Sequence, residues 1–383
     1  MAPPVRLPGV WCGTPPGSHG AVLTVGVEEE FLLLDPDTGA NAPVAEKVRA
    51  ALPEQARRQS RAEVRRSMLE MVTGVCTDLR DVRDQLGSLR RAAAIAADDA
   101  GVRLTAVAAT PVSEPDRSVP DDPRYHTMID RFGPLAQDPA LCGMHVHVGV
   151  GDRDLAVQVC NHLRIWLPVI QALTGNSPFF EGMDTGHSSW RNVQLRRWFS
   201  VAPTPYLRDA REHDRTVDDL IATGIMIDEG MVQWYARLSP RYPTVEIRMG
   251  DVCADVDDAV LVAALVRAAV DTALGEARAG RAAADPRDAV VFGAHWRAAR
   301  DGLGGDLVDL RDGRARPAWE LIGEFAALVD PSLRRSGDRE LVRDGLARLR
   351  ETGCGADRQR AVHRRTGDIR AALEALAMWT RTA

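Results

Sequence analysis

Lysine is almost missing from this chain of 383 residues, in which Lys47 is the single example and arginine supplies nearly all of the positive charge. A P-loop requires the lysine of its G-x-x-x-x-G-K-[ST] motif, and a Schiff-base enzyme requires a lysine in its pocket. Lys47 lies in the polar stretch APVAEKVRA, which fits neither arrangement. Both classes are therefore excluded, and any bound nucleotide must be held by arginine, backbone groups or metal ions.

Long apolar segments, paired cysteines and surplus basic charge are missing as well. No run approaches the roughly 20 apolar residues of a membrane span, and the N-terminal segment lacks the apolar core of a signal peptide. The six cysteines are scattered without a C-x-x-C pair, which favours reduced thiols. A formal net charge of −6 argues against nucleic acid as a partner. We therefore expect a cytoplasmic protein that binds neither membrane nor nucleic acid.

Segments typical of strands and of helices are mixed along the chain without regular β–α units, which favours an α+β fold. We expect a disordered, Pro/Gly-rich leader over residues 1–20. No linker or repeat interrupts the remainder, which predicts a single domain over residues 21–383. Within it, the apolar segment of residues 154–175 predicts a long helix with a kink at Pro168.

The stretch TVGVEEEFLLLDPDTG, residues 24–39, resembles a buried strand that carries three consecutive acids. Side chains alternate between the two faces of a strand, so Glu28 and Glu30 point one way while Glu29 points the other. The turn residues DPDTG end the strand at about Leu34. Two carboxylates on one apolar face repel each other and lose hydration unless a cation meets them. A solvated edge strand is the alternative interpretation.

Three further segments place polar side chains on one face of an apolar element. They contribute Glu63 with Glu70, His145 with His147, and Glu246 with Arg248. Each segment alone has an ordinary interpretation as a solvated face or a surface ion pair. Four such segments together favour one shared cavity that is rich in carboxylate oxygens, has one or two imidazoles and lacks a thiolate cluster. That ligand set selects Mg²⁺ or Mn²⁺ over zinc.

Arginine offers the positive charge that an anionic ligand would need. Residues 175–198 are too rich in Gly, Ser, Asn and Pro to be all helix, and they are typical of a loop that offers backbone N–H groups, Ser189 and Arg191. Arg237 and Arg248 are further candidates, because the fork of an arginine matches the oxygens of carboxylate and phosphate. An ordinary surface position is the alternative for each arginine.

Five motifs carry a resemblance to a known family: GVEEEFLLLDPDTG, MLEMVTGVCTDL, GMHVHVGV, NSPFFEGMDTGHSSWR and PTVEIRMGDVC. Their order and wording resemble those of the YbdK-type carboxylate–amine ligases, also called glutamate–cysteine ligase type 2, from about residue 22 to the end. The resemblance implies a catalytic domain like that of glutamine synthetase. In that fold a curved antiparallel sheet lines a funnel for ATP and metal ions, and helices lie outside.

The resemblance also implies roles for particular residues. The metal ligands would be Glu28, Glu30, Glu63, Glu70, His145 and Glu246. ATP or substrate would be bound by His147, Ser189, Arg191, Arg237 and Arg248. Of these, Arg191 and Arg248 would be catalytic, because they would hold the phosphate or the substrate carboxylate. Ala294 and His295 depart from the family pattern and leave that part of the pocket open.

The implied reaction joins a small carboxylate, such as glutamate, to an amine and uses ATP to form an acyl phosphate. Bringing two like unit charges to roughly 4 Å costs about 4 kcal/mol at an effective dielectric of about 20, so Mg²⁺ or Mn²⁺ must offset that cost. A guanidino-type phosphotransferase is one alternative. A metal- or nucleotide-binding protein without turnover is another. We expect a homo-oligomer, with a dimer as the first guess.

Overall fold

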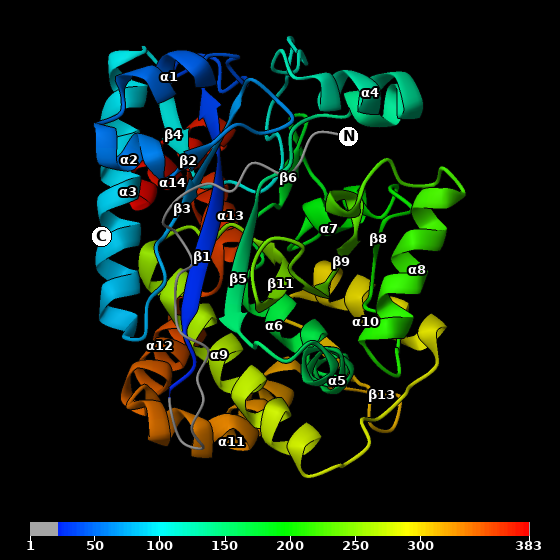
Figure 1. The fold of residues 1–383 in the computed structure, drawn as a ribbon. Coiled ribbons are helices and arrows are strands. Elements are labelled where there is room, and N and C mark those ends of the chain that lie inside the picture. Colours follow the sequence, from blue (N-terminus) through cyan, green and yellow to red (C-terminus); the bar gives the residue numbers. More distant parts are fainter. Residues whose placement is uncertain (1–21, 383) are drawn as a thin grey trace.

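The computed structural model describes residues 22–382 (Figure 1), and the leader expected over residues 1–20 lies outside them. A seven-stranded sheet has the order β10-β11-β5-β1-β3-β2, and β4 also pairs with β1. Its strands are β1 (Val25–Leu34), β2 (Ser60–Arg61), β3 (Met68–Val72), β4 (Arg103–Thr105), β5 (Gly143–Gly149), β10 (Ala236–Leu238) and β11 (Thr244–Asp251). Every pairing in this sheet is antiparallel. The α+β prediction is confirmed.

Helices supply most of the remaining structure, and three pairs of short strands lie among them. The helices are α1 (Ala45–Ala51), α2 (Glu54–Arg58), α3 (Leu79–Asp99), α4 (Pro123–Phe132), α5 (Arg153–Leu163), α6 (Leu167–Leu173), α7 (Trp190–Leu195), α8 (Ala210–Ala222), α9 (Val256–Arg278), α10 (Asp288–Asp301), α11 (Ala318–Ser336), α12 (Arg339–Thr352), α13 (Gly355–Thr366) and α14 (Ile369–Arg381). The short strands are β6 (Phe179–Phe180), β7 (Met183–Asp184), β8 (Val201–Ala202), β9 (Gln233–Trp234), β12 (Asp306–Asp309) and β13 (Arg314–Pro317).

The two faces of the sheet differ because apolar and polar residues alternate along its strands. One face contributes alternate valines to the main core, among them Val25 and Val27 of β1 and Val146 of β5. This face is covered by helices, and α9 packs against α3, α5, α11 and α12. In Figure 1 the long strands β1 and β5 cross the centre of the molecule, with α3 along one side and α8 on the other. The opposite face of the sheet is left for polar side chains.

The prediction of one long helix over residues 154–175 is wrong, because the chain forms two helices, α5 and α6, with a break between them. Pro168 lies in the first turn of α6. Proline fits that position because the first N–H groups of a helix have no partner within the helix. The proline therefore starts a new helix and does not kink a continuous one.

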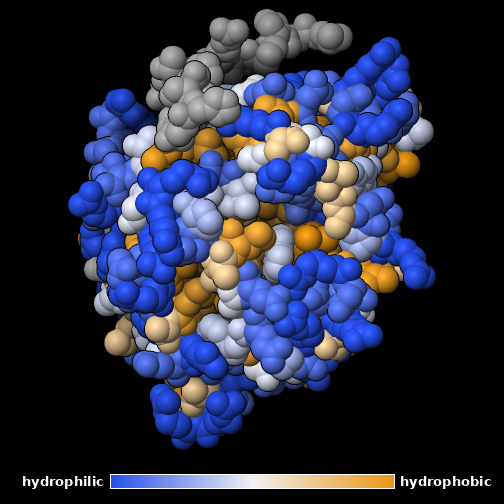
Figure 2. Space-filling model, turned by 90° about the horizontal axis from the view of Figure 1, so that it is seen from below, coloured by the Kyte–Doolittle hydropathy of each residue, from blue (hydrophilic) through white to orange (hydrophobic). Residues whose placement is uncertain are grey.

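The surface seen from below is mostly hydrophilic, with apolar residues showing toward the middle of that face (Figure 2). Among residues 22–382, every helix is too short or too polar to span a lipid bilayer.

Candidate active site

The register of the central strands brings the predicted polar side chains together on one face of the sheet. The cross-strand pairs are Glu28 with His145, Glu30 with Glu70, and Glu246 with His147. Residues directly opposite each other on antiparallel strands have Cβ atoms about 5 Å apart, so each pair is in reach of direct contact. The prediction that Glu28 and Glu30 share a face, and that His145 and His147 share it too, is confirmed.

A cavity of about 720 Å³ lies over this face. Its size falls within the range of about 300–1,000 Å³ that is usual for small-molecule sites. Every site residue predicted from the sequence lines this cavity except Ser189. The residues that line it are Glu28, Glu30, Glu63, Glu70, His145, His147, Arg191, Arg237, Glu246 and Arg248. The structure thus gathers side chains from β1, β3, β5, β10, β11, α7 and the loop after β2.

Glu28 is held between the two histidines. Its Oε2 lies 3.1 Å from Nδ1 of His145, and its Oε1 lies 3.2 Å from Nε2 of His147. Burial raises the pKa of Glu28, but the contacts with His147 and His145 outweigh that effect and hold the pKa well below its usual range. Glu28 is therefore a carboxylate at neutral pH.

The pKa values of the two histidines are shifted in opposite directions. Burial and the nearby charge of Arg248 lower the pKa of His145. Burial also lowers the pKa of His147, but Glu246 and Glu28 raise it, and the net shift is upward. Nδ1 of His147 lies 3.0 Å from the hydroxyl oxygen of Thr244. His145 is thus the more readily neutral imidazole of the two.

Two further acids, Glu63 and Glu70, form the end of the cavity nearest β3. Burial, together with repulsion from Glu30, raises the pKa of Glu63 to about 8. Burial and the charges of Glu28 and Glu63 raise the pKa of Glu70 well above its usual range. The protein's own cations therefore do not compensate all of the acids here, and the cluster favours a bound cation.

The donor set fits a divalent metal ion. Glu28, His147 and Glu246 each offer a ligand atom, and these atoms lie within 4.8 Å of one another. Carboxylate oxygens with an imidazole suit magnesium or manganese, and the buried cysteines of the described residues lie elsewhere. This group contains His147 where the resemblance pointed to His145. Nε2 of His145 lies 3.9 Å from Oε1 of Glu30, and its Nδ1 faces Glu28, so the ring of His145 lies between these two acids.

Arg237 and Arg248 both contact Glu246. Nε of Arg237 donates to Oε2 of Glu246 at 2.9 Å, and Arg248 forms an ion pair with Oε1 of the same carboxylate. Burial raises the pKa of Glu246, but Arg248 and Arg237 outweigh burial and hold the pKa well below its usual range. Arg237 also donates to the backbone carbonyl of Val232. Arg237 and Arg248 therefore share one carboxylate, and the guanidinium of Arg237 is held further by a backbone carbonyl.

Arg191 occupies a different setting from the one expected. The loop predicted over residues 175–198 is only partly correct, because the segment also contains β6, β7 and α7. Arg191 lies in the first turn of α7, and Ser189 caps that helix by accepting from the backbone N–H of Asn192. A helix of six residues is too short to show a periodic apolar pattern, so no sequence pattern predicts it.

Helix α4 also lines the cavity, and sequence analysis did not single it out. Arg124 pairs with Asp228 at 2.6 Å, and the hydroxyl of Tyr125 donates to the carbonyl of Ala62. Both contacts tie α4 to segments on other sides of the cavity. No residue of α4 is buried. The Asp122 cap, the proline at the first helical position and the amphipathic pattern of residues 123–132 are signals from which this helix could have been predicted.

His295, one of the two departures from the family pattern, lies behind the cavity wall. Its Nδ1 is 2.6 Å from Oε1 of Gln171, and its ring lies 4.4 Å from the ring of Tyr235, which lines the cavity. Burial lowers the pKa of His295 to about 3, so the ring is neutral. His295 therefore reaches the cavity lining through its contact with Tyr235.

The model of the glutamate–cysteine ligase family 2 (GCS2) matches residues 24–375. The chain belongs to this family. A protein of Salinispora tropica with the provisional name glutamate–cysteine ligase 2 is 61% identical over 360 residues, covering 94% of this chain and 95% of the relative. A protein of Mycobacterium sp. strain KMS with the provisional name glutamate–cysteine ligase 2-2 is 46% identical over 356 residues, covering 92% and 97%. Family membership makes the chain an ATP-dependent ligase that forms a carbon–nitrogen bond between small molecules and uses a divalent metal ion.

Solved structures share the fold at low sequence identity. A glutamate–cysteine ligase of Francisella tularensis in complex with AMP superposes with a TM-score of 0.68 at 12% identity, covering 95% of this chain and 90% of that one. A bifunctional glutathione synthetase of Pasteurella multocida gives a TM-score of 0.67 at 14% identity, covering 94% and 52%. The expected glutamine synthetase-like fold, an open antiparallel sheet with helices outside, is confirmed.

Proposed function

We propose that this ligase phosphorylates a small substrate carboxylate with ATP and then transfers the acyl group to an amine. The observation that carries the proposal is the cavity over one sheet face, which five buried or partly buried glutamates, two histidines, Arg191, Arg237 and Arg248 line together. The carboxylate oxygen attacks the γ-phosphorus and ADP leaves. The amine nitrogen then attacks the acyl carbon, phosphate leaves with the bridging oxygen, and the nitrogen gives up a proton. This route needs no protein nucleophile.

Mg²⁺ or Mn²⁺ would be held by carboxylates of Glu28, Glu30, Glu63, Glu70 and Glu246 and by the imidazole of His145. A bound divalent ion would neutralise the phosphate oxygens and reduce their repulsion toward the substrate carboxylate. The raised pKa values of Glu63 and Glu70 support this assignment, because they indicate acids that lack enough cationic partners. His147, which keeps its proton more readily, would donate to an anionic group of ATP or substrate by exchanging its contact with Glu28.

The arginines would bind the anionic groups. Arg191 has no closely paired carboxylate, since the nearest carboxylate oxygen recorded in residues 22–382 is 4.0 Å from its Nη1. Its fork is therefore suited to hold a phosphoryl group or the substrate carboxylate. Arg248 could turn to the same anion because Arg237 would still neutralise Glu246. Ser189 would contribute indirectly, by fixing the start of α7.

Glutamate is the first carboxylate to test, since the relatives carry names of glutamate–cysteine ligases. The direct test measures ADP release with Mg²⁺ or Mn²⁺ over a matrix of amino acids and amines. We expect sustained ADP release only when a carboxylate and an amine are both present, with one amide formed per ADP. Continuous formation of a stable phosphorylated product without an amine would indicate a phosphotransferase. No ADP under any mixture would indicate a binding protein and would contradict the proposal.

A further inference from the structure

Asp251, the last residue of β11, is a fully buried aspartate that lies beside the cavity and is not among the residues lining it. Its Oδ2 accepts hydrogen bonds from the hydroxyl of Ser177 at 2.7 Å and from the backbone N–H of Asn176 at 2.9 Å. Its Oδ1 accepts from the hydroxyl of Ser189 at 2.7 Å. One carboxylate thus binds both ends of the segment between residues 176 and 189, directly before α7.

These bonds lead to Arg191. The hydroxyl oxygen of Ser177, which donates to Asp251, also accepts from the backbone N–H of Arg191 at 3.1 Å. Ser189, the other hydroxyl on Asp251, is the N-cap of α7. The first turn of α7 is therefore fixed at two points by a single buried carboxylate, and Arg191 projects from that turn into the cavity.

The guanidinium of Arg191 is held on the sheet by weak hydrogen bonds, so its N–H groups can still bind an anion. Nη1 donates to the carbonyl of Met249 at 3.3 Å and Nη2 to the carbonyl of Arg248 at 3.5 Å, both long bonds. The group lies against Gly143, where a Cβ atom would come within 2.8 Å of Cζ of Arg191. Asp251 is 4.0 Å away, so it balances the charge of Arg191 without closing an ion pair on its fork.

We propose that Asp251 is a positioning residue that fixes Arg191 in the cavity so that its fork can hold the oxyanion of a substrate, an inference that rests on the proposed function. Its carboxylate accepts from four donors, those above and Nδ2 of Asn192, and a buried donor left without an acceptor is costly. The other arginines of the sheet face, Arg237 and Arg248, contact Glu246 instead. Arg191 is thus the arginine whose placement depends on a carboxylate outside the cavity.

A double-mutant cycle tests whether Asp251 acts through Arg191. Asp251→Asn, Arg191→Ala and the double variant are titrated by calorimetry with two probes, ATP with Mn²⁺ and glutamate. We expect Asp251→Asn to weaken the same probe that Arg191→Ala weakens, by about tenfold. The double variant should bind that probe no more weakly than Arg191→Ala alone. Losses that add in full, or a normal affinity in Asp251→Asn, would overturn the proposal.

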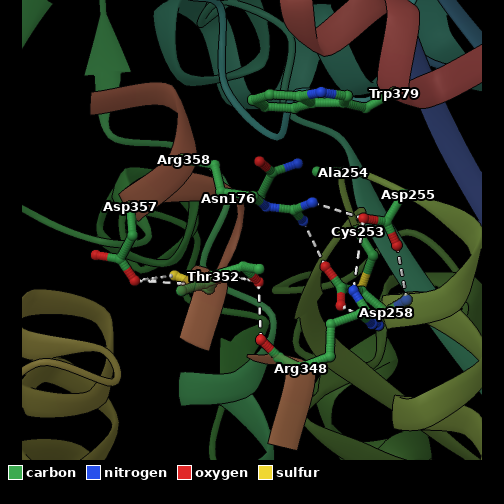
Figure 3. Close-up of polar contacts among 12 residues, drawn as sticks. Asn176, Cys253, Ala254, Asp255, Asp258, Arg348, Thr352, Asp357, Arg358 and Trp379 are labelled. Atoms are coloured by element: carbon green, nitrogen blue, oxygen red, sulfur yellow. Dashed lines mark hydrogen bonds and ion pairs between the residues drawn. The ribbon is translucent and has the colours of Figure 1, made fainter. Parts of the chain in front are cut away.

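The aspartate Asp258 provides a matched control for folding. It is also buried, it lies in the first turn of α9, and it pairs with Arg348 and Arg358 (Figure 3). None of these three residues lines the cavity. Asp258→Asn should lower the melting temperature while both probes keep their wild-type affinity. Equal losses of binding in Asp258→Asn and Asp251→Asn would mean that general destabilisation explains both, and the proposal would fail.

Gly143→Ala displaces Arg191 by a route that leaves Asp251 intact. The added methyl group would meet the flexible end of the Arg191 side chain, whose Nη2, Cζ and Nε are its nearest neighbours. We therefore expect little change in melting temperature, together with the same loss of probe binding as in Asp251→Asn. If Gly143→Ala bound both probes with wild-type affinity, the position of the Arg191 guanidinium would not matter for binding, and the proposal would fail.

A crystal structure of Asp251→Asn separates this inference from the proposed function. We expect the guanidinium of Arg191 to leave Gly143 while Glu28 and Glu246 keep their places. An unmoved Arg191 would overturn the positioning role even if the enzyme makes an amide. A protein that never releases ADP would overturn the proposed function, but a displaced Arg191 would still support the role of Asp251.

Discussion

At the scale of single residues, Glu28, Glu29 and Glu30 are adjacent but lie in different environments. Glu28 and Glu30 face the cavity, whereas Glu29 faces the helices and pairs with Arg90 of α3. Both partners of that pair are almost fully buried. Strand alternation predicts which acids share a face. It could not predict Arg90 as the partner, because the two residues are 61 positions apart and meet only in the folded chain.

Substitution of the three acids should therefore give two kinds of defect. Glu28→Gln and Glu30→Gln should sharply reduce metal-dependent ATP turnover while unfolding remains near wild type. Glu29→Gln should instead lower the free energy of unfolding by about 3 kcal/mol, because it leaves the buried Arg90 without its carboxylate. ADP release and urea denaturation measure the two effects. Equal losses of turnover in all three variants at matched folding would contradict the assignment of faces.

The histidines give a second prediction at this scale. His145→Ala should weaken Mn²⁺ binding more than His147→Ala, because a metal ligand must be a neutral imidazole. The pKa of His145 is lowered while that of His147 is raised, and His145 stands between Glu28 and Glu30. Calorimetric titration of both variants with Mn²⁺ decides the matter. The reverse order would make His147 the ligand, in keeping with its place beside Glu28 and Glu246.

At the scale of elements, the end of β1 and the start of α9 follow from local sequence signals, whereas the break between α5 and α6 and the short helix α7 do not. β1 ends at Leu34 as its turn residues predict, and α9 begins after an Asp255 cap. By contrast, α7 has six residues and is fixed by hydroxyl contacts with Asp251, which no local pattern reports. The five motifs contain most of the predicted site residues, but Glu63 and Arg237 lie outside them. The part played by α4 and the contacts of Asp251 came only from the structure.

The position of Arg191 in α7 leads to a kinetic prediction. Arg191→Lys keeps the charge and loses the planar fork, so kcat should fall by roughly tenfold or more while KM for ATP changes much less. A rise in KM for the carboxylate, with kcat unchanged, would assign Arg191 to substrate binding. Steady-state kinetics of this variant separate the two roles. Unchanged constants would leave Arg191 without a part in the reaction.

At the scale of the whole molecule, the buried acids of the cavity repel one another. The stability of the folded protein should therefore depend on pH and on a bound metal ion. The pKa of Glu63 is about 8 in the folded protein against an ordinary value of 4.5. The folded state therefore binds this proton more tightly than the unfolded state does. The resulting stabilisation is complete below the unfolded pKa and is lost as pH rises through about 8.

The metal-free protein should accordingly lose thermal stability between about pH 6 and about pH 8, and Mn²⁺ should restore it most at the upper end. Differential scanning calorimetry with and without Mn²⁺ measures this. Glu63→Gln, which cannot ionise, is the matched control and should flatten the pH dependence of the metal-free protein. A melting temperature that rises over the same pH range without metal, or a Glu63→Gln variant that behaves like wild type, would contradict the charge balance described here.

The central claim is that ATP phosphorylates the substrate carboxylate before the amine attacks. The most direct measurement follows ¹⁸O from the labelled carboxylate, glutamate first, into released phosphate during ADP formation with an amine. An acyl phosphate requires one labelled oxygen to appear in phosphate for each amide bond formed. Amide formation with unlabelled phosphate, or ADP release without any amide, would contradict the account.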